Sequence, residues 1–223
     1  MNRTSFFLIG LLLINASIHA QLNTIETEEQ IVRRLVLSGA TLPPDMTDSP
    51  YDNESFQLGE VFIKENKPYR AMLRYDAYRD NIEIKEEGKT YSLLKRDYIR
   101  VVFNNEKYAI FHYRTGKDEE KQGYFVQLTE GPLKLLKRKS KTFHYGTKGD
   151  GYTKAKPARF EDNVDYYIKQ GDEIAEQVRL RKKTILNALS NYKEASKIVK
   201  ERNLNLNKER EVVLLIKELN KAY

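Results

Sequence analysis

The chain has 223 residues, with 39 Lys and Arg against 32 Asp and Glu, and it contains neither Cys nor Trp. This length fits one medium domain or two small ones. The lack of Cys excludes disulfides, Cys-ligated metal centres and a thiol nucleophile, and three His leave little for a His-built metal site.

The first segment, residues 1–20, has the order of a secretory signal peptide. Arg3 is its one charge, residues 6–14 are apolar, and a short polar stretch ends at Ala20. The apolar run is shorter than the roughly 20 residues that span a bilayer, and no later stretch approaches that length. We therefore expect cleavage before Gln21 and an exported protein, periplasmic or secreted, with no transmembrane helix in the mature chain.

Residues 21–54 predict a short helix followed by an acidic, Pro-rich linker. Ile31, Val32 and Leu35 have helical spacing and follow several Glu, whereas the segment after Thr41 carries three Pro. The acids Asp45, Asp48, Asp52 and Glu54 are of the residue types that ligate calcium. Because these acids lack the spacing of an EF-hand loop, the linker is the preferred interpretation.

Residues 55–170 predict an antiparallel β-domain. Apolar and polar residues alternate with a period of two at residues 61–64, 69–76, 82–85 and 108–113, and polar or Gly-containing turns separate these runs. Closely spaced strands without intervening helices favour a meander that closes into a roll or partial barrel. His112, between Phe111 and Tyr113, is expected to be a half-buried packing residue.

Residues 171–223 predict a C-terminal helical region, which makes the fold class α+β. Ile185 and Leu189 begin one apolar stripe, and a cleaner one is formed by Val212, Leu215, Ile216, Leu219 and Tyr223. Asn207 is the expected N-cap of the last helix. The residues flanking Gly171 fit either a β-hairpin or a strand that leads into the first helix.

The most basic stretch, residues 134–159, is the candidate binding site. Its Gly-rich centre and its aromatic residues Phe143, Tyr145 and Tyr152 favour a site for an anionic glycan or a lipid head group; nucleic acid is unlikely for an exported protein. The alternative is a solvated strand pair, because Lys and Arg discourage edge pairing. The candidate anion-binding residues are Lys137, Arg138, Lys139, Lys141, His144, Lys154, Lys156 and Arg159.

No pattern in the chain indicates catalysis. The Gly-x-Ser-x-Gly and His-Glu-x-x-His arrangements do not occur, and residues 146–151 lack the spacing and ending of a phosphate-binding P-loop. We therefore expect no catalytic residues, no metal and no cofactor.

Residues 51–61 and 73–83 carry a recognisable pattern: a Phe-x-x-Gly turn into a strand, then a Leu-Arg-Tyr strand that leads to Asp-Asn-Ile-Glu. With residues 165–168 and 203–205 near the end, the chain resembles uncharacterised exported proteins of Bacteroidota over residues 50–223. The resemblance implies no established activity. Together with the composition, it favours an exported, non-enzymatic envelope or interaction protein whose partner is an unknown envelope protein; the alternative is the anion-binding module.

Overall fold

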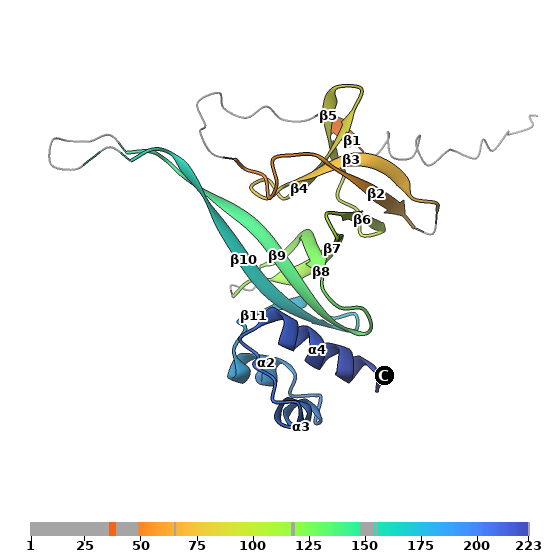
Figure 1. The fold of residues 1–223 in the computed structure, drawn as a ribbon, viewed down its shortest axis with the longest axis vertical. Coiled ribbons are helices and arrows are strands. Elements are labelled where there is room, and N and C mark those ends of the chain that lie inside the picture. Colours follow the sequence, from red (N-terminus) through yellow and green to blue (C-terminus); the bar gives the residue numbers. More distant parts are fainter. Residues whose placement is uncertain are drawn as a thin grey trace, which may run out of the picture.

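The computed structural model describes residues 36–38, 49–64, 66–116, 119–147, 154 and 156–222 (Figure 1). Its strands are β1 (Val36–Ser38), β2 (Gln57–Ile63), β3 (Tyr69–Asp76), β4 (Asn81–Glu86), β5 (Lys89–Leu93), β6 (Ile99–Phe103), β7 (Glu106–Arg114), β8 (Glu120–Gln127), β9 (Leu133–His144), β10 (Arg159–Gln170) and β11 (Ala175–Val178). Its helices are α2 (Lys182–Ala188), α3 (Ala195–Glu201) and α4 (Glu209–Asn220).

The strands form one sheet whose order is β1-β5-β4-β3-β2-β6-β7-β11-β10-β9-β8, with a further pairing of β7 with β8. That pairing closes β7–β11 into a ring, which we call the barrel. Strands β1–β6 stay open and are called the outer sheet; it joins the barrel where β6 pairs with β7. The two parts lie one above the other in Figure 1.

The barrel closes with one parallel pair, between β11 and β7. Its strands form a meander of five, and the first and fifth strands of an antiparallel meander run in the same direction, so only a parallel pair can close the ring. Five buried residues form one cluster from these strands: Tyr113, Phe125, Leu136, Tyr167 and Ala175. Three of their aromatic rings meet edge to face with centroids 5.1–5.4 Å apart, which is a favourable geometry.

The outer sheet has the alternation that its sequence predicts. In β3, Ala71, Leu73 and Tyr75 are buried while Arg70 and Met72 are exposed. The three buried side chains of β3 belong to one apolar cluster with buried residues of β2, β4, β6, β7 and β8. The cluster therefore runs from the outer sheet onto the outside of the barrel.

The helices cover the barrel strands β9, β10 and β11 at the end remote from the outer sheet (Figure 1). One face of α4 contributes four buried residues, Val212, Leu215, Ile216 and Leu219. They pack with Leu133 and Leu135 of β9. Lys208, and not Asn207, directly precedes α4 and no side chain caps it, so the predicted Asn207 cap is wrong.

The α+β class and a partly closed β-domain followed by helices are confirmed, because the described chain is mostly strand and carries its helices at the C-terminal end. Gly171 lies in the turn of a hairpin between β10 and β11, so the helices begin only at Lys182. The predicted signal peptide and the helix near residues 26–35 lie outside the described residues, and Val36 begins β1. Among the described helices, none is both long enough and apolar enough to cross a membrane.

Candidate functional site

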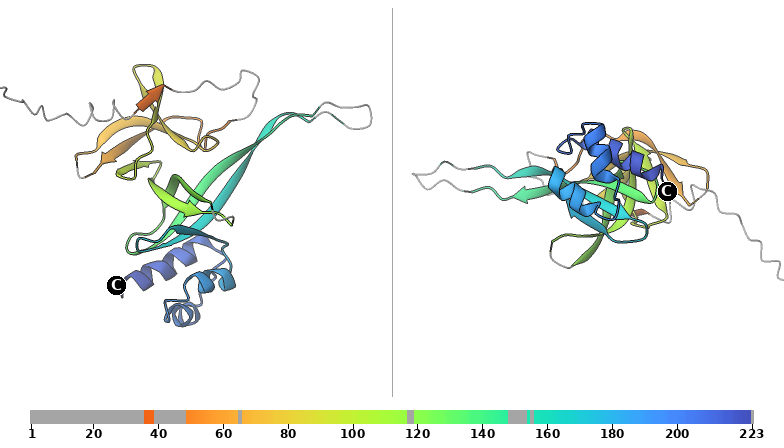
Figure 2. Two further views of the ribbon diagram at one scale, coloured as in Figure 1. Left: turned by 180° about the vertical axis from the view of Figure 1, so that it is seen from behind. Right: turned by 90° about the horizontal axis from the view of Figure 1, so that it is seen from below.

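The basic stretch folds into a long two-stranded ribbon. Strands β9 and β10 have 12 residues each and pair along their whole length. The ribbon begins inside the barrel and then runs out of it, so that its far end projects from the body (Figures 1 and 2). We call the projecting part, residues 139–147 and 156–165, the arm.

Lys137 and Lys139 are not free to bind a ligand, because carboxylates surround both of them. Lys137 Nζ lies 3.2 Å from Glu209 and 3.8 Å from Glu106, and Lys139 Nζ lies 2.7 Å from both Asp52 and Glu106. Burial alone lowers the pKa of Lys139, but the hydrogen bonds to Asp52 and Glu106 outweigh it and raise the pKa. These pairs tie β7, α4 and the segment before β2 to β9.

Arg138 points to the opposite face of β9, toward the barrel residues. Its guanidinium lies 5.2 Å from the centroid of the Tyr113 ring. Burial lowers the pKa of Arg138, yet the nearby Asp80 carboxylate and the surrounding tyrosines outweigh burial and raise it. Arg138 is therefore an internal cation and not part of an outer anion-binding surface.

Asp80 is the centre of a polar junction between the outer sheet and the barrel. It lies in the β3–β4 turn with φ 55°, a conformation that Asp tolerates better than most residues. Its carboxylate accepts hydrogen bonds from Tyr75 Oη at 2.7 Å, Lys95 Nζ at 2.7 Å and Tyr124 N at 3.2 Å. Sequence reasoning missed this residue, and the Asp-Asn turn pair was the one local signal for it.

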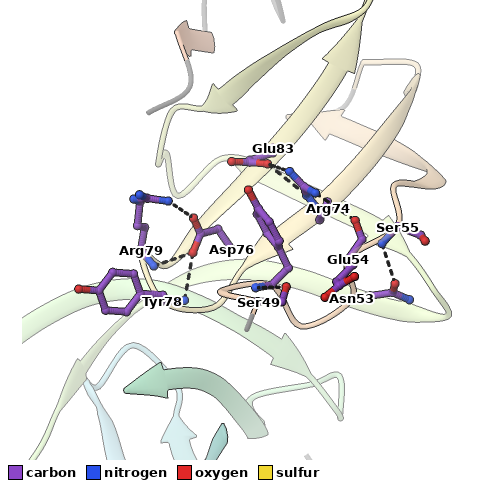
Figure 3. A network of polar contacts seen from close by, with 10 residues as sticks. Ser49, Asn53, Glu54, Ser55, Arg74, Asp76, Tyr78, Arg79 and Glu83 are labelled. Carbon is purple, nitrogen blue, oxygen red and sulfur yellow. Dashed lines mark hydrogen bonds and ion pairs between the residues drawn. The ribbon is translucent and has the colours of Figure 1, made fainter. Parts of the chain in front are cut away.

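Arg74 holds the segment before β2 against β3 and β4 (Figure 3). Its guanidinium lies 3.3 Å from the ring centroid of Tyr51 and 4.2 Å from that of Phe56. Arg74 also donates to the buried Glu83 at 2.6 and 3.2 Å and to the carbonyl of Glu54 at 3.0 Å. Residues of the 51–61 and 73–83 pattern thus meet here in a structural role.

Asp76 shapes the turn that contacts the arm (Figure 3). Its carboxylate accepts hydrogen bonds from the backbone N–H groups of Tyr78 and Arg79, at 3.1 and 2.8 Å, and from the Arg79 guanidinium at 2.9 Å. The turn places the Tyr78 ring 5.2 Å from Phe160 and 6.4 Å from Phe143, between centroids. The arm is thereby fixed to the outer sheet at this aromatic contact.

The outer residues of the arm alternate between ion pairs and exposed apolar side chains. Lys141 lies 3.1 Å from Asp162, and Glu161 lies 2.8 Å from His144 and 3.8 Å from Arg159. Tyr145 and Val164 are 85% and 52% exposed. Of the remaining candidates, Lys154 and Lys156 are exposed near the far end. The eight candidate anion-binding residues therefore do not converge on one concave surface.

A shallow pocket of about 400 Å³ lies beside β7, and His112 lines it together with Glu120 and Lys169. His112 is exposed and its Nδ1 lies 2.8 Å from Glu120, so its predicted role as a half-buried packing residue is wrong. Burial, together with Lys134, lowers the pKa of Lys169, whose ammonium donates to the carbonyl of Glu173 at 2.7 Å. Within the described ranges, no group of three or more His, Asp or Glu is placed to hold a metal ion.

Comparisons with protein-family models, with curated proteins and with solved structures gave no match for this chain. The function of the protein is therefore inferred from its sequence and from the geometry described above.

Proposed function

We propose that this is an exported, non-enzymatic interaction protein and that the arm is its recognition element. The observation that carries the proposal is the arm itself: a ribbon that projects from the body, exposes Tyr145 and Val164, and is anchored at its base by ion pairs and by Tyr78. Exposed apolar and aromatic side chains on a preorganised element are typical of interaction surfaces. The exported location and the lack of catalysis are inferred from the sequence.

Two pairs of exposed apolar residues allow a matched test of this proposal. Changing Tyr145→Ser with Val164→Thr removes apolar surface from the arm. Changing Leu58→Ser with Met72→Thr removes it from the outer sheet, where Leu58 and Met72 are 66% and 40% exposed. Because none of the four side chains is buried, both variants are expected to melt like the wild type.

Chemical cross-linking in cells, followed by purification of the protein and mass spectrometry, measures the partner. We expect the arm variant to recover at least about tenfold less partner than the wild type, which corresponds to the loss of about 1.4 kcal/mol of binding free energy. The outer-sheet variant should recover the wild-type amount. Equal recovery by both variants would contradict the proposal.

A second candidate function, binding of an anionic glycan or lipid head group, is favoured by one observation. Lys154 and Lys156 are exposed near the far end of the arm, and Arg159, close by, is also largely exposed. Lys137, Arg138 and Lys139 do not support it, because they are engaged inside the protein.

The test of this second function changes only exposed charges. Lys154→Gln with Lys156→Gln should weaken retention on heparin, and the wild-type retention should fall steeply with salt because screening shortens the reach of each charge. Lys193→Gln with Lys197→Gln removes the same charge from the exposed surface of the helical region and is the control. Equal weakening by the two variants would show diffuse attraction to a basic protein and would exclude a site on the arm.

A further inference from the structure

We propose that two copies of this chain associate through the open edge of β10, with Asp162 of each copy on a two-fold axis. The inference rests on the proposed function, because it takes the arm as the interaction element and names a second copy of the chain as its partner.

Strand β10 has neighbours on both sides only toward its inner end. β9 pairs with all of its residues, whereas β11 pairs with residues 166–168. In the part of the chain that the structure describes, no strand pairs with residues 161–165 on the side opposite β9. Such an edge is a template on which another chain can add a strand.

The backbone groups that face this edge follow from one hydrogen bond. The N–H of Lys141 donates to the carbonyl of Ala77 at 3.0 Å and so points away from β10. Opposite residues of an antiparallel pair exchange both of their hydrogen bonds or neither, so Lys141 and Asp162 form a non-bonded pair. Asp162 therefore presents its N–H and C=O to the open side, and Val164 does the same two residues later.

A two-fold axis at Asp162 brings complementary side chains together. It places Arg159 opposite Asp165 of the other copy, and Phe160 opposite Val164. Opposite charges and apolar residues that face each other across strands stabilise the pairing. Val164, which is 52% exposed, would then pack beside the Phe160 ring of the second copy. The two Asp162 carboxylates meet at the axis, but each one already lies 3.1 Å from Lys141 Nζ of its own chain.

The neighbouring registers are less favourable. An axis at Asn163 sets Glu161 opposite Asp165, which are like charges. An axis at Val164 sets Asp162 opposite Tyr166, whose outer side is already taken by β11. The charges and the pairing with β11 therefore favour the axis at Asp162 over these two neighbouring registers.

The chain has no Cys, so a single introduced Cys reports the register directly. In a bonded antiparallel pair the Cα atoms lie about 5.5 Å apart, which fits a disulfide. Asp162→Cys should form a covalent dimer when incubated with oxidised glutathione. Glu161→Cys is the control, because Glu161 would face Asn163 of the other copy, so the two introduced thiols would be offset along the strands. A dimer from Asp162→Cys in clear excess supports the register; equal yields, or no dimer from either, overturn it.

A charge exchange tests the same interface without a new covalent bond. We expect light scattering after size exclusion to show a concentration-dependent dimer for the wild type. Arg159→Asp and Asp165→Arg, each alone, should shift it toward the monomer, because each places like charges opposite each other. The double variant restores opposite charges with reversed polarity and should recover the dimer. A wild type that stays monomeric at every concentration, or a double variant no better than either single one, overturns the proposal.

These outcomes separate the dimer from the proposed function. If the wild type is monomeric but loses its captured partner when Tyr145 and Val164 are changed, the dimer is refuted and the arm keeps its role. If Asp162→Cys cross-links selectively while the variant changed at Tyr145 and Val164 recovers as much partner as the wild type, the dimer is supported and the wider recognition role is refuted.

Discussion

At the scale of single residues, the Asn220 side chain makes the kind of backbone hydrogen bonds that a neighbouring strand would otherwise make. Its Nδ2 donates to the carbonyls of Glu130 and Leu133, both at 2.7 Å, and its Oδ1 accepts from the N–H of Leu133 at 3.0 Å. Gly131 allows this approach, since at its φ of 105° a Cβ would lie 2.8 Å from the Asn220 amide. The last residue of α4 is thereby bound to the β8–β9 connection.

Changing Asn220→Asp should test this contact with almost no change in volume. The carboxylate loses both donors and faces two carbonyl oxygens, so we expect a loss of about 1–3 kcal/mol in the free energy of unfolding at neutral pH. Since the folded state disfavours this carboxylate, its pKa is raised there. The lost stability should therefore return in part as the pH falls through this raised pKa, and the return should be complete below the ordinary carboxyl pKa of about 4.

Asn207→Asp is the control for Asn220→Asp, because Asn207 is exposed and the charge change is the same. Chemical denaturation at neutral and acidic pH gives the comparison. Equal free energies of unfolding for the two variants at neutral pH would contradict the role assigned to Asn220.

The partners of the basic residues could not be predicted from the sequence. Lys139 binds Asp52, 87 positions away, and Glu106, 33 positions away. Local composition shows the density of positive charge but not the acids that the fold brings to it. The basic ribbon itself was predictable, because residues 134–159 carry strand-forming and turn-forming residues, whereas the distribution of its charges was not.

At the scale of elements, β9 connects every part of the molecule. Leu133 and Leu135 pack against the helices. Lys137 and Lys139 form ion pairs with acids from β7, α4 and the segment before β2. Phe143 contacts Tyr78 in the β3–β4 turn. These residues share one face of the strand because side chains alternate with a period of two. One continuous strand thus serves as the support for both the helices and the outer sheet.

Adjacent leucines in α4 allow the packing of the helices to be measured. Leu215 is 0% exposed and Leu214 is 36% exposed. Leu215→Ala should lower the free energy of unfolding by about 2–5 kcal/mol, because it leaves a cavity among well-packed side chains. Leu214→Ala should lower the free energy of unfolding by well under half of that amount. Because both variants replace Leu with Ala in the same helix, the change in helix propensity is the same for both.

The signal for Leu215→Ala should appear in the whole protein, since α4 packs on β9. Thermal unfolding followed by near-ultraviolet circular dichroism reports the tyrosines of the β-domain. An unchanged melting of these tyrosines in Leu215→Ala would refute the packing of the helices on the barrel.

At the scale of the whole molecule, the sequence predicted the strands and a partly closed sheet, but not which pair of strands closes it. The period-two runs of residues 61–64, 69–76 and 82–85 lie in or next to β2, β3 and β4. Closure depends on β11, a strand of four residues that pairs with β7 through Ala175 and Glu176. A strand this short leaves no periodic pattern in the sequence, and its partner is far away along the chain.

The buried tyrosines predict how the protein responds to alkali. Burial raises the pKa of Tyr75, Tyr108 and Tyr124, and burial with the Asp165 charge raises the pKa of Tyr167 to about 12. An unfolded Tyr has a pKa of about 10. Because the folded values are raised, their contribution to stability is complete below about pH 10 and is lost as the pH rises toward 12.

We therefore expect tyrosinate absorbance and loss of secondary structure to rise together in one steep alkaline transition. Tyr167→Phe removes one of the linked protons and should make the fall of stability above pH 10 less steep. Tyr145→Phe, on an 85% exposed ring, should leave it unchanged. Tyrosines that all ionise gradually while the circular dichroism stays constant would contradict this prediction.

The parallel closing pair also has a consequence for the order of events during folding. Arg114 and Glu176, which are bound to each other across that pair, are 62 positions apart. Contacts between distant positions form slowly, because closing the loop costs conformational entropy before the contact contributes any favourable free energy. The hairpins of β2 to β6 can form as the chain emerges from the ribosome, but the barrel must wait for residues 175–178. A chain that stops before them would hold a complete outer sheet beside a barrel with two open edges.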